Sequence, residues 1–407
     1  MADLSRIYGS QYFEQVITVT NKSEFPSFPR SDILYFIDGK VDLEEKEITV
    51  GSSGLFCVGH NLDLSSLFST ADNYIMFSGS EMGNIFFSNM SISVSGAGSS
   101  VYAGVAATGN EVLELDHFNY NNCSSLGYLD GFRQGLETVV GRYGGKPELE
   151  LRGSWSGYKS SVVNTFGLDS DFSGSLFKAG AGLMFNSRFF CDMNLNIPTN
   201  ASFSDFSISN FASPSLCQIQ NAIFARNGVV STGDNEFFPN LNPEDLVCSW
   251  KNNQGLRNTF EGGRLSLSTE IVTPIPSANT FYTILGTWST DDLQHFSSPS
   301  NGQLRNDGTN PISFTLISYL SIVGTANDAL DIRVRRWDSE NSQLLTAYSQ
   351  KATVNSLSGP RDVAFVPINY NITMNQNDYI YLEVANLTGA NSVTLELDSF
   401  IQINTRA

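Results

Sequence analysis

The clearest pattern in the chain is a short unit of alternating apolar and polar residues that recurs between Glu81 and Gly228. Its spacing, apolar-x-apolar-x-x-apolar-x-apolar, occurs twice, 28 residues apart, at Ile85, Phe87, Met90 and Ile92 and at Leu113, Leu115, Phe118 and Tyr120. Alternation with a period of two is typical of a strand that has one buried face. The extra polar residue in the middle indicates two strands joined by a tight corner, both with the same face inward.

Looser copies and strand-sized pieces follow these two units. They are Leu149 with Leu151, Leu176-Phe177, Met193 to Ile197, and Phe203, Phe206 and Ile208. One such unit cannot bury its own apolar face, so recurrence every ~20–30 residues predicts a solenoid of stacked turns. The predicted corners contain Ser88-Asn89, Asp116-His117 and Ser204-Asp205, and Asn and Asp tolerate left-handed backbone angles. We therefore expect a right-handed parallel β-helix over residues 31–240, with an irregular antiparallel sandwich as the alternative.

The segments that flank this body differ from it in character. Residues 1–30 show no sustained period and form an N-terminal arm that either attaches to an assembly or caps the first turn of the solenoid. Asn242-Pro243-Glu244 has the order of a helix start, so residues 241–277 are expected to form a helical connector. Residues 278–407 contain longer, cleanly alternating strands separated by polar turns, which predicts an antiparallel β-sandwich of jelly-roll type. The whole chain is thus expected to be all-β apart from the connector.

Composition narrows the possible partners and compartments. The 407 residues carry a formal net charge of -18, and only 16% are charged. Nucleic acid and anionic membranes are poor partners for such a chain, because phosphate binding needs a basic surface. The N-terminus lacks the features of a secretory signal, and no apolar run is long enough to span a membrane. The five cysteines contain no CxxC pair and mostly have apolar neighbours, so we expect buried free thiols.

Two passages resemble stretches that recur in tailed-bacteriophage structural proteins. One runs from Val112 to Leu115 and on through Asn121-Asn122-Cys123-Ser124-Ser125-Leu126-Gly127 to Gly131-Phe132-Arg133-Gln134-Gly135-Leu136. The other combines Asn327 to Val334 with Asn377 to Asn386. The order of parts is similar to phage fibre and spike proteins, which stack a parallel β-helix ahead of a trimeric jelly-roll tip.

This resemblance implies a homotrimeric virion component that is made in the host cytoplasm. Its arm would join other virion proteins, and its body would contribute to recognition of a glycan or protein on the host surface. Attachment to the tail and attachment to the capsid, as a head fibre or decoration protein, both stay open. Side-by-side packing of three chains is also suggested by aromatic residues expected to point outward, namely Tyr102, Tyr120, Tyr128 and Trp155.

The enzymatic alternative is a polysaccharide depolymerase, because many phage spikes of this build cleave host glycans. Glycoside hydrolysis uses two carboxylates about 5–10 Å apart. Glu114 with Asp116, beside His117, and Asp169 with Asp171 meet that requirement on an outward strand face. Alternating acids on strands are mostly solvated, however, so we assign no catalytic residue.

Two stretches resemble a metal-binding or a nucleotide-binding motif, but each lacks the residue that is most diagnostic of that motif. The stretch from Asp169 imitates a calcium loop, but its twelfth position is Gly180 and not Glu. The stretch Gly141 to Pro147 imitates a phosphate loop, but proline stands where the magnesium-binding hydroxyl belongs. The three histidines are far apart in sequence. We assign no cofactor and no metal.

Trp155 and Tyr158 are the candidate glycan-binding residues. They lie in the stretch Gly153 to Lys159, which is rich in glycine and serine and which we interpret as a flexible polar loop. Exposed rings on such loops stack on sugar faces. The alternative is that Trp155 packs against a neighbouring subunit.

Overall fold

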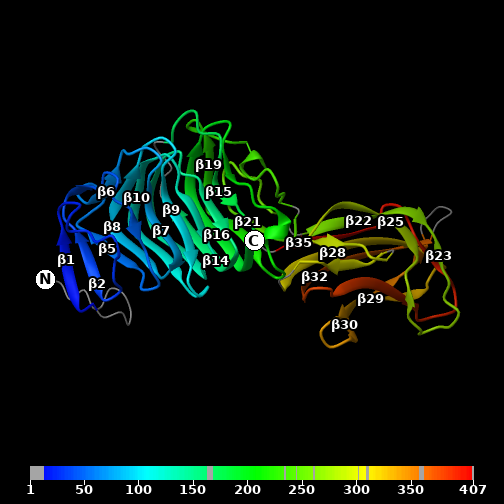
Figure 1. Cartoon of the computed structure of the whole chain (residues 1–407). Helices are drawn as coiled ribbons and strands as arrows, with labels where there is room; N and C mark the ends of the chain where they lie inside the picture. Colours follow the sequence, from blue (N-terminus) through cyan, green and yellow to red (C-terminus); the bar gives the residue numbers. More distant parts are fainter. Residues whose placement is uncertain are drawn as a thin grey trace. The chain divides into compact units, whose positions relative to one another are not determined.

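The computed structural model describes residues 13–162, 168–232, 235–243, 245–259, 262–300, 302–308, 311–356 and 362–405. The chain divides into two compact units, Met1–Asn258 and Thr259–Ala407. Figure 1 shows the first in blue to green and the second in green to red. Of the expected N-terminal arm, residues 1–12 lie outside the described residues.

The first unit is built from two sheets, the large sheet and the small sheet, whose strands pair in parallel except for β19 with β20. The large sheet runs in the order β1 (Gln15–Val19), β2 (Ile33–Ile37), β5 (Leu55–Gly59), β8 (Ile85–Val94), β10 (Val112–Cys123), β12 (Gln134–Gly145), β14 (Ser154–Val162), β16 (Met184–Ile197), β18 (Leu216–Gln220) and β21 (Cys248–Lys251). At its margins lie β3 (Lys40–Asp42), β6 (Ser66–Ser69), β19 (Ile223–Arg226) and β20 (Val229–Val230). The small sheet runs in the order β17 (Ser202–Ser204), β15 (Ser175–Ala179), β13 (Leu149–Arg152), β11 (Gly127–Asp130), β9 (Ser100–Ala106), β7 (Ile75–Met82) and β4 (Ile48–Thr49).

From β7 to β17 the chain passes back and forth between the two sheets, and each strand pairs in parallel with the equivalent strand of the next turn. Leu113 in β10 pairs with Ile85 in β8, and Phe118 pairs with Met90, as the repeat spacing predicted. The described residues therefore form a β-solenoid of about seven turns. The antiparallel alternative for this region is wrong.

Two of the three corners predicted within the repeat are left-handed, whereas Asp205, which follows the end of β17 at Ser204, is not. Asn89 in β8 has φ 52° and His117 in β10 has φ 48°, so both adopt the left-handed conformation. At each corner the extra residue resets the alternation, which turns Phe87 and Met90 inward on either side of Asn89. The interior is a continuous apolar core with stacked rings, for example Phe87 and Phe118 with centroids 5.5 Å apart.

All five cysteines are free and buried, as their apolar neighbours predicted. Burial raises the pKa of the Cys57, Cys191 and Cys248 thiols and raises that of Cys123 and Cys217 to about 12. A thiol with so high a pKa stays protonated at neutral pH and is a poor nucleophile.

The expected helical connector is wrong. Pro243, Leu246 and Val247 lie in turns, and Cys248–Lys251 is strand β21, which pairs with β18. The capping residues close a turn instead of opening a helix, since the Asn242 amide donates to the Asp245 carboxylate at 2.7 Å. Pairing of Cys248 with Cys217 then continues the large sheet, and this tertiary pairing overrides the local preference. The described residues contain only two short 3-10 turns, Ile208–Asn210 and Asn235–Phe237.

The second unit consists of two antiparallel sheets around one core, in a sandwich-like arrangement. The first sandwich sheet contains β23 (Val272–Thr273), β34 (Val393–Leu395), β28 (Ile312–Val323), β35 (Phe400–Thr405), β22 (Gly262–Glu270), β25 (Gly286–Gln294), β32 (Asp362–Met374) and β31 (Asn355–Ser356). The second sandwich sheet contains β26 (Phe296–Ser297), β27 (Leu304–Asn306), β33 (Tyr379–Asn386), β29 (Ala329–Asp338), β30 (Gln343–Thr353) and β24 (Tyr282–Thr283). β22 and β23, which the sequence placed in the connector, thus belong to this unit.

Candidate functional site

The predicted glycan-binding residues Trp155 and Tyr158 are core residues. They are 0% and 1% exposed, on β14, and no flexible loop is present at this point. Trp155 and Tyr158 are three residues apart, so the strict alternation of β14 is broken between them and both rings turn inward, beside a register shift that places one extra residue on β16. Trp155 stacks on Phe132 at 5.8 Å and donates its indole N–H to the Arg152 carbonyl at 2.7 Å. Neither ring can stack on a sugar, and Trp155 packs within its own chain and not against a neighbouring subunit.

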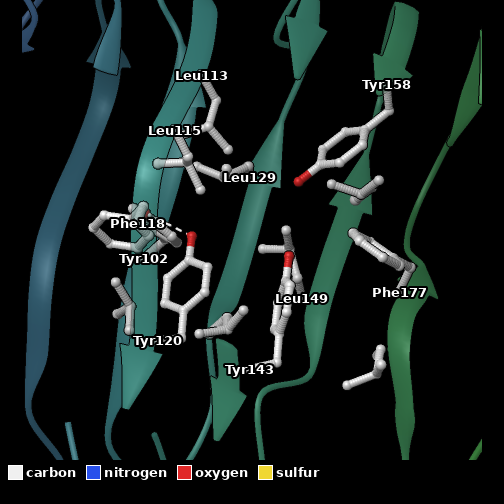
Figure 2. Close-up of a cluster of buried hydrophobic side chains, with 14 of the residues drawn as sticks. Tyr102, Leu113, Leu115, Phe118, Tyr120, Leu129, Tyr143, Leu149, Tyr158 and Phe177 are labelled. Atoms are coloured by element: carbon white, nitrogen blue, oxygen red, sulfur yellow. Dashed lines mark hydrogen bonds between the residues drawn. The ribbon is translucent and has the colours of Figure 1, made fainter. Parts of the chain in front are cut away.

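The aromatic residues expected to point outward are also mostly internal. Tyr102 and Tyr120 are fully buried and their hydroxyls hydrogen-bond at 3.0 Å, marked by the dashed line in Figure 2. Tyr128 is half-buried beneath the Arg152 guanidinium, 3.9 Å from the ring centroid. These rings therefore give no support to side-by-side packing of three solenoids.

The solenoid core contains a fully buried acid, Glu137, that the sequence analysis did not single out. Its carboxylate is fully buried and accepts hydrogen bonds from the hydroxyls of Tyr143 at 2.5 Å, Tyr158 at 2.7 Å and Ser160 at 2.5 Å. Figure 2 shows the two tyrosines reaching from successive strands into the same interior. Burial raises the pKa of Glu137, although the three hydrogen bonds act in the opposite direction. Because solvent does not reach the carboxylate, this cluster is a structural element of the core.

The predicted carboxylate pairs lie on the surface. Glu114 and Asp116 are half-buried on the outer face of β10, and Asp116 contacts the His117 ring nitrogen Nδ1 at 2.9 Å. Partial burial, and secondarily the Asp116 charge, raise the pKa of Glu114. Asp171 is exposed and paired with Lys146 at 2.7 Å, and this hydrogen bond lowers the pKa of the Asp171 carboxyl.

The surface of the solenoid contains a groove across β12, β14 and β16, here called the basic groove. It has a volume of about 260 Å³. Its lining consists of Arg133, Gln134, Leu136, Ser156, Gly157, Tyr158, Lys159, Ser187 and Arg188. The parallel register explains how distant residues meet here, because Gln134 pairs with Gly157, which in turn pairs with Arg188.

The floor of the groove is the backbone of Gly157. A Cβ at this position would lie 2.9 Å from the Arg188 carbonyl oxygen, so a larger residue would both crowd β16 and fill the groove. The floor is held to the preceding turn by the Ser156 amide, which donates to the Arg133 carbonyl at 2.7 Å. The glycine that suggested a loop in the sequence therefore forms a depression in a sheet.

Three cations surround this depression on three successive turns of the solenoid. Arg133 precedes β12, Lys159 lies in β14 and Arg188 lies in β16. None of them makes an ion pair with the residues that the structure describes. Lys159 and Arg188 are instead 6.0 Å and 5.6 Å from the centroid of the Phe190 ring, a distance suited to cation–π attraction. The groove thus presents unpaired positive charge next to hydroxyl and amide groups, an arrangement suited to holding an anion.

Within the described residues no group of three or more His, Cys, Asp or Glu side chains is placed to hold a metal ion. The same residues include no helix of the length and apolarity that crossing a bilayer requires.

Comparisons with known proteins give little further guidance. No protein-family model matches the chain, and no curated protein matches it. Among solved structures, murine APRIL at pH 5.0 is 10% identical with a TM-score of 0.26, and covers 36% of this chain and 99% of its own. Eiger TNF from S. frugiperda is 12% identical with a TM-score of 0.25, and covers 36% of this chain and 93% of its own. No conclusion about the function of this chain follows from scores of this size.

Proposed function

We propose that this chain is a homotrimeric fibre or spike protein of a tailed-bacteriophage virion that contributes to recognition of the host surface. The resemblance of its two passages to phage structural proteins, and the order of a solenoid followed by a sandwich, support this proposal. In the same proposal the solenoid is right-handed, the sandwich is a jelly roll, and the N-terminal segment joins other virion proteins. Tail and capsid attachment are distinguished by electron cryomicroscopy of the intact particle.

The observation that carries self-association is a part of the first sandwich sheet in which three neighbouring stretches carry no charged residue. Three neighbouring stretches, Ile312–Val323, 363–374 and Phe400–Thr405, contain no Asp, Glu, Lys, Arg or His. This is unusual in a chain of net charge -18, in which other surfaces of two copies would repel each other. A face without charge is the surface that costs least to bury between identical chains.

Aromatic rings lie across these three stretches, and at their margin the Arg264 guanidinium of β22 lies 4.2 Å from the centroid of the Phe400 ring. Tyr319 in β28 stacks between Phe365 of β32 at 5.9 Å and Phe400 of β35 at 6.4 Å. Phe365 is 50% exposed. Aromatic residues in the centre of a neutral patch are typical of protein interfaces, so we assign the contact between copies to this face.

Light scattering on the purified chain tests this proposal. We expect a mass about three times the 44.5 kDa of one chain. Phe365→Asp introduces a charge into the face and is expected to give monomers, because an unpaired charge is costly to bury. Leu344→Asp on the second sandwich sheet, where Leu344 is 38% exposed, is the matched control and should leave the mass unchanged. A monomeric wild-type chain, or a Phe365→Asp variant of unchanged mass, would contradict the assignment.

A polysaccharide depolymerase is the second candidate function, favoured by the raised pKa of Glu114 beside Asp116. A carboxyl of raised pKa next to a second carboxyl is the arrangement that general acid catalysis of glycan cleavage uses. Release of reducing sugar or unsaturated product from host glycan, lost in Glu114→Gln, would establish it. Intact glycan after incubation with the wild-type chain would exclude it for that substrate.

A further inference from the structure

We propose that the basic groove binds an acidic polysaccharide, with Arg133, Lys159 and Arg188 contacting its carboxylate or sulfate groups. This inference rests on the proposed role in surface recognition, for which it supplies the site and the class of ligand. The three cations lie on three successive solenoid turns, so their charges follow one another along the stacking direction. A chain carrying one acidic group after another matches such a row better than a single small anion does.

The remaining lining of the groove suits a sugar. Gln134, Ser156 and Ser187 supply amide and hydroxyl groups that can both donate to and accept from sugar hydroxyls. Leu136 in the groove supplies apolar surface for the C–H face of a ring. The volume of about 260 Å³ is slightly below the ~300–1,000 Å³ of pockets for drug-sized ligands, which fits one sugar unit of a longer chain.

The distribution of charge distinguishes this ligand from other polyanions. The chain as a whole carries a net charge of -18, so a long nucleic acid would be repelled by most of its surface. The arginine guanidinium binds carboxylate in a bidentate, planar geometry, and exposed Arg133 and Arg188 are free to do so on either side of Gly157. A sparsely charged glycan can place its acidic groups at these cations while its neutral parts contact the rest of the groove.

The test is equilibrium binding of the full chain to polygalacturonate, dextran sulfate and uncharged dextran at low ionic strength. We expect one or both acidic polymers to bind and dextran not to bind, and the responding polymer identifies the acidic group as carboxylate or sulfate. Combined Arg133→Gln, Lys159→Gln and Arg188→Gln substitutions should weaken binding by more than about tenfold. The reason is that each of the lost charge-assisted hydrogen bonds contributes to the free energy of binding. Raising the salt concentration to about 1 M should weaken it as well.

A charge-matched control uses Lys40→Gln, Lys251→Gln and Lys351→Gln, three exposed lysines outside the groove. The control should bind like the wild-type chain. Binding of neither acidic polymer, equal loss in the control, or full binding by the groove variant would overturn the proposal. Equally tight binding of duplex DNA would overturn the assignment to a glycan.

The mass of each variant, measured by light scattering on the same samples, separates the two proposals. A trimer that does not bind acidic polymers refutes the groove assignment alone. A monomer that binds them and loses binding in the groove variant refutes the trimer alone.

Discussion

At the scale of single residues, the most informative position is Glu137, a carboxyl inside an apolar solenoid. Glu137 pairs with Leu115 of the preceding turn and with Ser160 of the next turn. It therefore occupies an inward position that holds an apolar or a small residue in those turns. An ionised carboxylate in such a place is costly unless it is hydrogen-bonded. The hydroxyls of Tyr143, Tyr158 and Ser160 supply these bonds, which makes the four residues a single unit within the core.

The raised pKa of Glu137 predicts a definite dependence of stability on pH. Burial places its pKa in the folded chain above that in the unfolded chain, so the folded state binds the proton more tightly. The resulting stabilisation is fully present below the unfolded pKa of about 4.3 and is lost as the pH rises through the folded pKa. The Gln side chain in Glu137→Gln does not titrate. We therefore expect the free energy of unfolding of the wild-type solenoid, relative to that of Glu137→Gln, to fall as the pH rises above about 4.

Urea unfolding of both proteins across this pH range measures the difference directly. Other titrating groups change the free energy of unfolding of both proteins equally, so their contributions cancel in the difference between the two. Parallel pH profiles would show that Glu137 has the same pKa in the folded and unfolded chains.

At the scale of elements, the left-handed corners determine how each turn of the solenoid closes. Asn89 and His117 break β8 and β10 at equivalent places, and the inward positions resume on the far side of each. Asparagine tolerates this conformation, and its side-chain amide donates to the Ser88 hydroxyl at 3.1 Å. A β-branched residue does not tolerate it, because its side chain collides with its own backbone.

Asn89→Thr is therefore expected to lower the free energy of unfolding of the solenoid by about 1–3 kcal/mol. Asn89→Gly should change it by much less, because glycine adopts φ of 52° without strain. Thermal or urea unfolding of the two variants beside the wild-type chain gives the comparison. Equal destabilisation by both substitutions would mean that the side-chain hydrogen bond, and not backbone conformation, is what matters at this corner.

Features that are encoded by neighbouring residues could be predicted from the sequence. The repeat and its corner lie within a few consecutive residues, so their spacing predicted the parallel pairing of β8 with β10 and the corners at Asn89 and His117. Trp155 and Tyr158 were misplaced because a glycine within a strand, such as Gly157 of β14, looks the same in sequence as a glycine in a loop. Asn242 and Pro243 suggested a helix because local preference contains no information about the strand that Cys248 pairs with.

The basic groove could not be predicted from the sequence for a related reason. Arg133, Lys159 and Arg188 belong to different turns, and the loops between the turns differ in length. No fixed spacing therefore connects these cations in the sequence. Only the register that places Gln134 beside Gly157, and Gly157 beside Arg188, brings them together.

At the scale of the whole molecule, the two units have separate apolar cores and different kinds of buried polar cluster. The solenoid core contains Trp155 and the Glu137 cluster. In the sandwich, Asp378 is buried, pairs with Arg336 at 2.5 Å and accepts a hydrogen bond from the Ser339 amide at 2.8 Å. These bonds, and one from the Asn375 amide, lower the pKa of Asp378 although burial alone would raise it.

Separate cores predict that the two units unfold in separate transitions. Trp155→Ala should lower the stability of the solenoid by about 3–5 kcal/mol, because it leaves a cavity in a packed interior. Asp378→Asn should lower that of the sandwich by a similar ~3–5 kcal/mol, because it leaves the partly buried Arg336 without its counter-charge. Calorimetry should show that each variant shifts one transition and leaves the other in place. All samples are compared at one protein concentration, because association makes the measured stability depend on concentration. A single transition that both variants shift would show instead that the solenoid and the sandwich unfold as one cooperative unit, and the independence inferred from their cores would be wrong.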